Sequence, residues 1–220
     1  ELQLPQVKTE HIVSDLRWRD LSEPSETVKP RKRFFIGEKC STKDKTIAFI
    51  PAYHYSYGKK SASLQIITDN KAINIPFDKL EYSEKPLYVK IDNCVFSHEG
   101  IILDYKDNGL TLEGKLCFEG LSPIRYDIMG PFKYVPFMQC KHSVYSICHK
   151  INGEIRVNDQ LYKFENGIGY IEGDCGRSFP IKYIWTQCCF ENNSLMLSVA
   201  DIPFLGIHSR ALSVLFCLTE

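Results

Sequence analysis

The stretch that decides the fold is Ile101-Ile102-Leu103-Asp104-Tyr105-Lys106-Asp107-Asn108-Gly109-Leu110-Thr111-Leu112-Glu113-Gly114. Two runs rich in aliphatic residues flank the polar segment Asp107-Asn108-Gly109. Asparagine followed by glycine tolerates the positive backbone φ angles that the tightest hairpin turns require. The stretch therefore predicts an antiparallel β-hairpin.

Short strands and polar turns continue on both sides of this hairpin. Aliphatic residues alternate with polar or tyrosine residues in 87–92 and again in 143–147, as is typical of half-buried strands. Residues 154–157 and 160–164 are joined by the turn-forming pair Asn158-Asp159. No amphipathic helix longer than about ten residues is evident after residue 30. We therefore predict an all-β fold, either a sandwich or a barrel.

Other glycines and prolines are expected to end strands or to form the turns between them. Asn166-Gly167 predicts a further turn, and Pro51 is expected to end the strand that begins at Thr46. The prolines in residues 123–136 exclude central strands there, so this break is the expected junction between two antiparallel β units. We place these units at 31–140 and 141–220, after a loosely ordered N-terminal arm at 1–30.

Composition narrows the range of partners and cofactors. The 220 residues contain 27 basic and 27 acidic side chains, so no net charge favours nucleic acid or an anionic membrane surface. No apolar run approaches the roughly 18 residues of a membrane-spanning helix. The nine cysteines include no C-x-x-C pair, which favours free thiols in a reducing cytoplasm. Neither metal-ligand spacing nor a phosphate-binding glycine loop is present, so we expect no cofactor.

The segment Gly169-Tyr170-Ile171-Glu172-Gly173-Asp174-Cys175-Gly176-Arg177-Ser178-Phe179-Pro180 combines two carboxylates, an arginine and three glycines. The glycines predict a tight turn. If the chain is extended locally, Glu172 and Asp174 face the same side and disfavour each other's ionisation. Two interpretations are open: the acids cap a structural corner, with Arg177 paired to Asp174, or they belong to a site.

This segment resembles part of the bacterial tocopherol cyclase-like proteins, as do residues 129–142 (MGPFKYVPFMQCKH) and 194–206 (SLMLSVADIPFLG) in the same order. The resemblance covers about residues 34–206. It implies two consecutive lipocalin-like antiparallel barrels, of which the second ends early or diverges towards the C-terminus. Two features differ from the family pattern: Gly173 and Cys175 replace a lysine and a tryptophan, and Gln139 stands where glutamate is usual.

The resemblance also implies a chemistry, because the plant members close the chromanol ring of tocopherols from a prenylated quinol. Protonation of an isoprenoid double bond needs an acid in an apolar pocket and aromatic faces near the cation. The expected function is acid-catalysed cyclisation of an apolar, prenylated substrate, or a related hydration or isomerisation. The alternatives are a non-catalytic binder of a hydrophobic small molecule and a member without activity. The candidate catalytic residues are Asp174, Glu172 and His142, and the candidate substrate-binding residues are Arg177, Trp185, Tyr170, Phe179 and Gln187.

Overall fold

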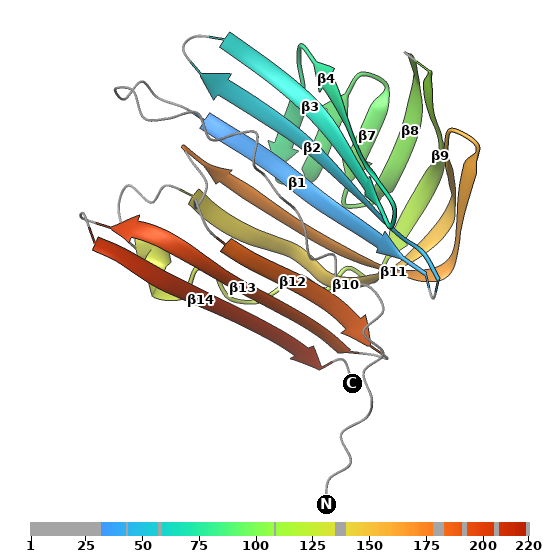
Figure 1. Ribbon diagram of the computed structural model, residues 1–220. Helices are drawn as coiled ribbons and strands as arrows, with labels where there is room; N and C mark the ends of the chain where they lie inside the picture. Colours follow the sequence, from blue (N-terminus) through green and yellow to red (C-terminus); the bar gives the residue numbers. More distant parts are fainter. Residues whose placement is uncertain are drawn as a thin grey trace, which may run out of the picture. The chain divides into compact units, whose positions relative to one another are not determined.

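A computed structural model describes residues 32–42, 44–56, 59–107, 109–134, 140–177, 183–190, 193–204 and 207–218 (Figure 1). The predictions for the arm at 1–30, for Phe179 and for Gln139 lie outside these residues. The described chain is almost entirely strand, which confirms the predicted all-β class.

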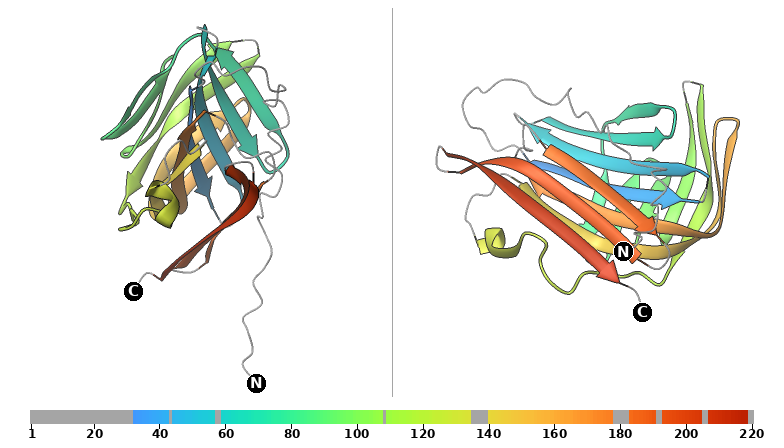
Figure 2. Two further views of the ribbon diagram at one scale, coloured as in Figure 1. Left: turned by 90° about the vertical axis from the view of Figure 1, so that its left-hand side faces the viewer. Right: turned by 60° about the horizontal axis from the view of Figure 1, so that its bottom comes forward.

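The described strands follow one another with short connections. Their bounds are β1 Lys32–Ser41, β2 Thr46–Ser56, β3 Lys59–Thr68, β4 Ala72–Phe77, β5 Glu81–Glu84, β6 Leu87–Ile91, β7 Cys94–Ser97, β8 Gly100–Asp107, β9 Leu110–Glu119, β10 Cys140–Val157, β11 Gln160–Gly176, β12 Tyr183–Phe190, β13 Asn193–Phe204 and β14 Ile207–Leu218. A 3₁₀ helix, η2 (Gly130–Tyr134), lies between β9 and β10 and is the short yellow-green coil of Figure 2.

Contacts divide the chain into two compact units, and the larger unit spans Pro24–Ile181. Its eleven strands form one antiparallel sheet in the order β4-β3-β2-β1-β11-β10-β9-β8-β7-β6-β5. Most neighbours are also neighbours in sequence, as expected of hairpins. The exception is the pairing of β1 with β11, which places the chain's first described strand inside the sheet, between β2 and β11.

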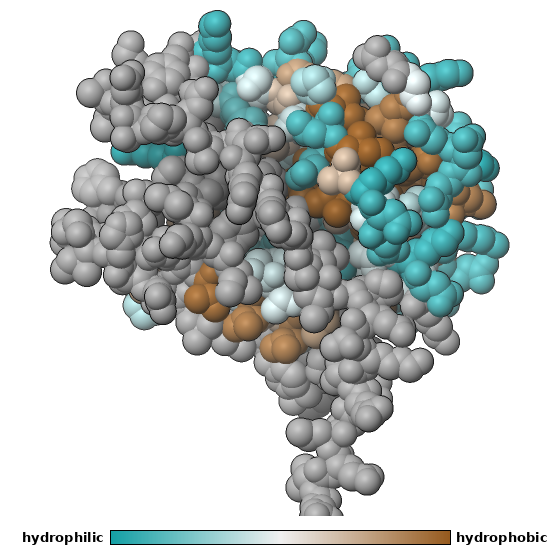
Figure 3. Space-filling model, in the orientation of Figure 1, coloured by the Kyte–Doolittle hydropathy of each residue, from teal (hydrophilic) through white to brown (hydrophobic). Residues whose placement is uncertain are grey.

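This sheet curls so that its two halves face each other across a hydrophobic interior. The rings of Phe49 on β2 and Phe96 on β7 lie 5.9 Å apart, and those of Phe77 on β4 and Tyr105 on β8 lie 5.5 Å apart. Phe49 and Phe96 are fully buried. In Figure 3 hydrophobic side chains of this part of the molecule (brown) are surrounded by hydrophilic ones (teal). The interior is therefore a packed core.

The predicted hairpins at 101–114 and 154–164 are confirmed. Asp107 pairs with Leu110, and Gly109 has the positive φ of 77° that the turn requires. Asn158, with a φ of 54°, turns β10 into β11, and Val157 pairs with Gln160.

Three predicted chain breaks are wrong, because the strands continue through them. β11 runs unbroken through Asn166-Gly167 and through the supposed tight turn at 169–176. Asn166 does have a positive φ of 54°. It lies at a shift in the register between β10 and β11, so it is a local irregularity within the strand and does not end it. β2 likewise continues past Pro51 to Ser56, because β3 pairs with it on the other side.

Residues 123–134 form no strand, as their prolines predict, and they contain η2. The expected domain boundary at 140/141 falls where β10 begins. Because β10 pairs with β9 and β11 pairs with β1, residues 140–176 extend the sheet formed by the strands before them.

The remaining described strands form a second antiparallel sheet in the order β12-β13-β14. Within this unit, Gln187 on β12 is buried and donates a hydrogen bond from its amide to the Ser194 hydroxyl (3.2 Å). Across the residues that the structure describes, we find no helix with the length and hydrophobicity of a membrane span.

Candidate functional site

The candidate site is built on the paired ends of β10 and β11. His142 on β10 lies directly opposite Asp174 on β11. The Nδ1 atom of His142 is 3.1 Å from the Oδ1 atom of Asp174, which makes a hydrogen-bonded ion pair when the ring is protonated. Asp174 Oδ1 also accepts a hydrogen bond from the Sγ of Cys140 at 3.5 Å.

Glu172 approaches the other ring nitrogen of His142. Strand alternation places Tyr170, Glu172 and Asp174 on the same face of β11. The Nε2 atom of His142 is 3.6 Å from the Oε2 atom of Glu172, and the Tyr170 hydroxyl donates a hydrogen bond to that same oxygen at 2.8 Å. We call these four residues, Tyr170, Glu172, Asp174 and His142, the acid–histidine cluster.

The acid–histidine cluster is largely removed from solvent. The side chains of His142 and Asp174 are each 16% exposed, and that of Glu172 is 12% exposed. Burial alone would lower the pKa of His142, but the hydrogen bond to Asp174 and the charges of Asp174 and Glu172 outweigh it and raise the pKa to about 9. At neutral pH the ring is therefore an imidazolium held between two carboxylates.

Glu172 lies beside the backbone of β1 at Gly37, its paired residue. A Cβ atom at Gly37 would stand 3.6 Å from Cγ and 3.9 Å from Oε1 of Glu172. These are ordinary contact distances, so the glycine leaves room beside the Glu172 side chain rather than relieving a clash.

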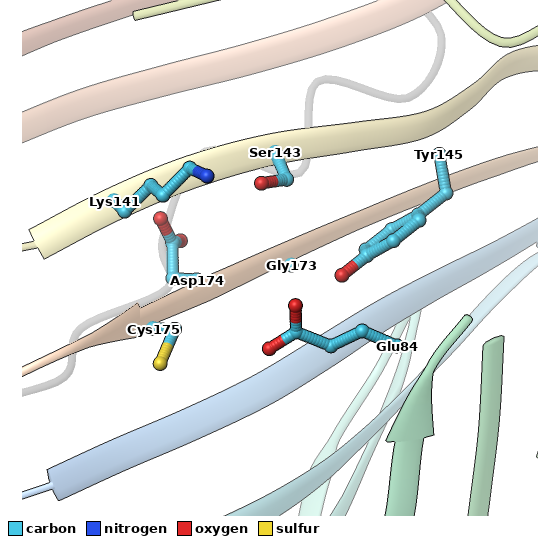
Figure 4. A pocket seen from close by; sticks show the side chains of 7 residues that line it. All are labelled: Glu84, Lys141, Ser143, Tyr145, Gly173, Asp174 and Cys175. Atoms are coloured by element: carbon cyan, nitrogen blue, oxygen red, sulfur yellow. The ribbon is translucent and has the colours of Figure 1, made fainter. Parts of the chain in front are cut away.

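A cavity of about 270 Å³ lies beside the cluster, within the unit that spans Pro24–Ile181 (Figure 4). It separates β5, at one edge of the sheet, from β10 and β11 near its centre. Its lining consists of Glu84, Lys141, Ser143, Tyr145, Gly173, Asp174 and Cys175. In Figure 4 the Tyr145 ring extends from β10 with its hydroxyl directed towards the carboxylate of Glu84. Burial and the charges of Glu84, Cys175 and Asp174 raise the pKa of Tyr145 to about 12, so Tyr145 carries a hydrogen-bond donor.

The structure brings together four of the predicted site residues, Asp174, Glu172, His142 and Tyr170. Arg177 is exposed and follows the end of β11, and no ion pair between it and Asp174 is found among the described residues. Asp174 is instead paired with His142. Trp185 and Gln187 lie on β12 in the other unit, and their predicted contacts with substrate stay predictions.

Sequence reasoning did not find Cys140, Tyr145 or Glu84. Cys140 and Tyr145 lie in the same segment as His142, and strand alternation could have placed Tyr145 on the face opposite His142. Nothing in the sequence signals Glu84, because it enters the cavity only through the curling of the sheet. Within the described part of the chain, no three His, Cys, Asp or Glu side chains are grouped so that they could hold a metal ion.

Comparison with known proteins finds similarity in structure only. No protein-family model and no curated protein matches the sequence. Among solved structures, kievitone hydratase from Nectria haematococca matches with a TM-score of 0.54 and 10% sequence identity over 83% of this chain and 60% of the hydratase. A protein of Nitrosomonas europaea provisionally named AttH matches with a TM-score of 0.48 and 9% identity over 83% of this chain and 68% of that protein.

The likeness to kievitone hydratase concerns the fold. It supports the predicted all-β barrel or sandwich fold and does not assign the chain to a family. The chain spans 60% of the length of the hydratase.

Proposed function

We propose that this protein is an acid–base enzyme that adds an O–H group across a carbon–carbon double bond of an apolar, prenyl-type substrate. Two features of the protein support this chemistry. One is its lipocalin-like β fold, and the other is a protonated histidine placed between two carboxylates. When the O–H group belongs to the substrate, the product is a ring, as in a tocopherol cyclase-like reaction. When it belongs to water, the product is an alcohol, the type of reaction that the name of kievitone hydratase states for that protein.

The observation that carries the proposal is the position of the His142 proton. Nδ1 is engaged by Asp174 at 3.1 Å, whereas Nε2 is buried and has no hydrogen-bond partner among the described residues. Glu172 Oε2, at 3.6 Å, is too distant for a good hydrogen bond but close enough to stabilise the charge. The Nε2 proton is thus the one available for donation once a substrate displaces the surrounding groups slightly.

The step balances within the cluster and the substrate. His142 Nε2–H gives its proton to one alkene carbon, which forms a C–H bond as the π bond breaks. The oxygen of the attacking hydroxyl forms a bond to the other carbon, and its proton passes to Glu172 or Asp174. Return of that proton to His142 restores the starting state, and Tyr170 holds the orientation of Glu172 throughout.

A deuterium experiment tests this reaction. The protein is incubated in D₂O with a hydroquinone that carries a prenyl group next to one hydroxyl, and the products are returned to H₂O and separated by liquid chromatography with mass detection. Cyclisation adds one carbon-bound deuterium, and hydration adds water as well. We expect His142→Gln and Asp174→Asn to lower the rate by about 10²–10⁴-fold, because each removes a proton-transfer group.

Glu172→Gln is expected to lower the rate less than Asp174→Asn, because Glu172 does not form the short bond to His142. Glu165→Gln is the matched control, since it removes an exposed carboxylate of β11 that pairs with Lys163 on the surface. Equal rates for the wild type, His142→Gln and Asp174→Asn would contradict the proposal.

The second candidate function is non-catalytic binding of a hydrophobic small molecule. The packed interior around Phe49, Phe96 and Leu64 disfavours the central ligand of a lipocalin, so such a ligand would occupy the cavity beside Tyr145. Native mass spectrometry of the protein as purified would reveal a retained molecule. Binding without any deuterium incorporation would favour this function over catalysis.

A further inference from the structure

The segment 121–134, between β9 and β10, concentrates exposed aromatic side chains. Among the described residues five large hydrophobic side chains are exposed, and three of them belong to this segment: Tyr126 is 60% exposed, Phe132 39% and Tyr134 78%. We call these three residues the aromatic patch. Single exposed hydrophobic residues are normal on a protein surface, whereas a group of them marks a surface of interaction. In the right-hand view of Figure 2, η2, which carries Phe132 and Tyr134, stands outside the strands of its unit.

This segment is held on β10 beside the acid–histidine cluster. The backbone N–H of Ser122 donates a hydrogen bond to Ser146 Oγ at 3.1 Å, and the Ser122 carbonyl accepts one from the N–H of Ile147 at 3.0 Å. Further along the segment, the Sδ atom of Met129 accepts a hydrogen bond from the backbone N–H of His142 at 3.4 Å. The aromatic patch is therefore carried by a segment with fixed attachments to the sheet.

Residues 126–134 are compact because two turns follow one another. The N–H of Gly130 donates to the carbonyl of Asp127 at 2.9 Å, and the N–H of Phe132 donates to the carbonyl of Met129 at 3.1 Å. The members of the aromatic patch lie within these turns or next to them, so their rings belong to one small area of the surface.

The exposed charges of the segment are basic. Arg125 and Lys133 are both exposed, and the Nζ atom of Lys133 lies 4.8 Å from the centroid of the Tyr134 ring. The single acid of the segment, Asp127, is partly buried, and its carboxylate accepts a hydrogen bond from the N–H of Met129 at 2.9 Å. Although the whole chain has no net charge, this surface presents positive charge beside aromatic rings.

We infer that the aromatic patch docks on the surface of a lipid bilayer that contains anionic lipids. Tyrosine suits the headgroup layer, because its ring is apolar and its hydroxyl stays hydrated. Arg125 and Lys133 complement the negative charge of such a surface. Lysine is depleted in the interfaces between proteins, so the combination of two tyrosines with Lys133 fits a bilayer better than a protein partner.

Docking has a consequence for the acid–histidine cluster, and this consequence rests on the proposed function. Because Met129 joins the segment to His142, the docked protein holds the cluster close to the lipid. A prenyl-type substrate dissolves in the hydrocarbon of the bilayer, so it would reach the cluster without first crossing water. The docking itself does not depend on the reaction.

A flotation assay over a range of lipid concentrations tests the docking. It uses the full chain and two kinds of vesicle, pure phosphatidylcholine and a mixture of phosphatidylcholine and phosphatidylserine at about 3:1. The wild type should bind both, and the mixture more tightly. The triple variant Tyr126→Ser/Phe132→Ser/Tyr134→Ser should bind both kinds of vesicle at least about tenfold more weakly, since burial of a single aromatic ring contributes this much.

The matched control for the triple variant is Ile102→Ser/Leu161→Ser. These side chains are 43% and 38% exposed and lie on β8 and β11, outside the segment, so this variant should bind vesicles as the wild type does. Circular dichroism and thermal melting verify that each variant is folded.

Arg125→Gln and Lys133→Gln test the role of charge. Each should weaken binding to the mixed vesicles about fivefold, the effect of one basic residue near an anionic surface, and should leave binding to pure phosphatidylcholine unchanged. Lys60→Gln is the control, because it removes an exposed lysine of β3.

Four results would overturn the inference. They are no vesicle binding by the wild type, wild-type binding by the folded triple variant, an equal loss in Ile102→Ser/Leu161→Ser, and wild-type binding of the mixed vesicles by both Arg125→Gln and Lys133→Gln. The deuterium experiment is decided separately. Vesicle binding by a wild type that incorporates no deuterium would contradict the proposed function and leave the docking surface standing, whereas deuterium incorporation by a wild type that binds no vesicles would overturn the docking alone.

Discussion

His142 lies between two carboxylates, and its protonation therefore couples folding to pH. The pKa of His142 is raised to about 9 in the folded protein, against about 6.5 in an unfolded chain. A raised pKa means that the folded state binds the proton more tightly. The protonated His142 ring therefore stabilises the folded state fully below about pH 6.5, and this stabilisation is lost as the pH rises through about 9.

We predict that His142→Gln removes this pH dependence. Between pH 6.5 and about 9 the wild type should lose on the order of 2–3 kcal/mol of unfolding free energy that the variant does not lose. Urea denaturation of both proteins across this range measures the difference. Parallel curves for the wild type and the variant would show that the imidazolium is not stabilised by Asp174 and Glu172.

His149 titrates in the opposite direction. It is buried against the Phe118 ring, with a centroid distance of 4.5 Å, and burial lowers its pKa to about 4. The folded state favours the neutral His149 ring. The contribution of this ring to the stability of the fold is therefore complete above about pH 6.5 and is lost as the pH falls through about 4.

We therefore predict that His149→Phe makes the protein more resistant to acid. Phenylalanine keeps the ring packing but has no proton to take up, and Ser146 retains its bonds to Ser122 and Cys148. Thermal melting between pH 6.5 and about 4 should show a smaller fall for the variant than for the wild type. His98→Gln, at an exposed histidine, is the control and should follow the wild type.

At the scale of elements, β10 and β11 are in close contact at one point. A Cβ atom at Gly169 would lie 2.1 Å from Nε2 of His149 and 2.5 Å from its Cε1, far inside contact distance. The ring cannot move aside easily, because Phe118 packs against it. Only a residue without a side chain allows the two strands to pair here.

We predict that Gly169→Ala lowers the free energy of unfolding by about 1–3 kcal/mol, the usual cost of overpacking a core. Gly37→Ala is the control, since its Cβ atom would meet Glu172 only at 3.6 Å and alanine suits a strand better than glycine. Urea denaturation measures both. Equal stability of Gly169→Ala and Gly37→Ala would show that the two strands can separate without cost.

The sequence predicts elements better than it predicts where they end. Alternation and the Asn108-Gly109 pair identify β8 and β9, because both signals are local. The continuation of β11 through Asn166 and through 169–176 depends on hydrogen bonds to β10 and β1, whose residues are distant in sequence. Glycines that fit closely packed strands therefore resemble the glycines of a turn.

The candidate site likewise contains residues that a local sequence pattern predicts and residues that it does not predict. Glu172 and Asp174 could be placed on one face from their spacing, and both do lie beside His142. The cavity residue Glu84 carries no local signal, and neither does Glu38, a fully buried acid on β1 outside the site, since their surroundings arise only when the sheet curls. The surroundings of Glu38 and Glu84 are therefore set by tertiary contacts, which no local sequence pattern reveals.

At the scale of the whole molecule, the main hydrophobic cluster formed by the described residues lies in one unit. Its fully buried members, from Ile36 on β1 to Ile171 on β11, all lie within Pro24–Ile181. A core contained in one unit is the physical requirement for independent folding.

We predict that a chain of residues 24–181 folds without the remainder. It should give a β-type circular dichroism spectrum and a single cooperative thermal transition. The full-length protein measured under the same conditions provides the comparison. A broad, non-cooperative transition of the shorter chain would show that residues outside 24–181 are needed to complete this unit.

The pairing of β1 with β11 also has a kinetic consequence. Glu38 meets Ile171 across 133 residues (171 − 38), and all the strands between them join through shorter connections. Closing a long loop costs more chain entropy than closing a hairpin, and folds rich in such distant pairings fold slowly. The β10–β11 hairpin can form His142–Asp174 early, whereas Gly37 and Glu38 arrive only when the first strand docks. β1 can pair with β2 early, but a nascent chain must leave the other edge of β1 unpaired until β11 has been synthesised, and that exposed edge is the natural point for a chaperone to act.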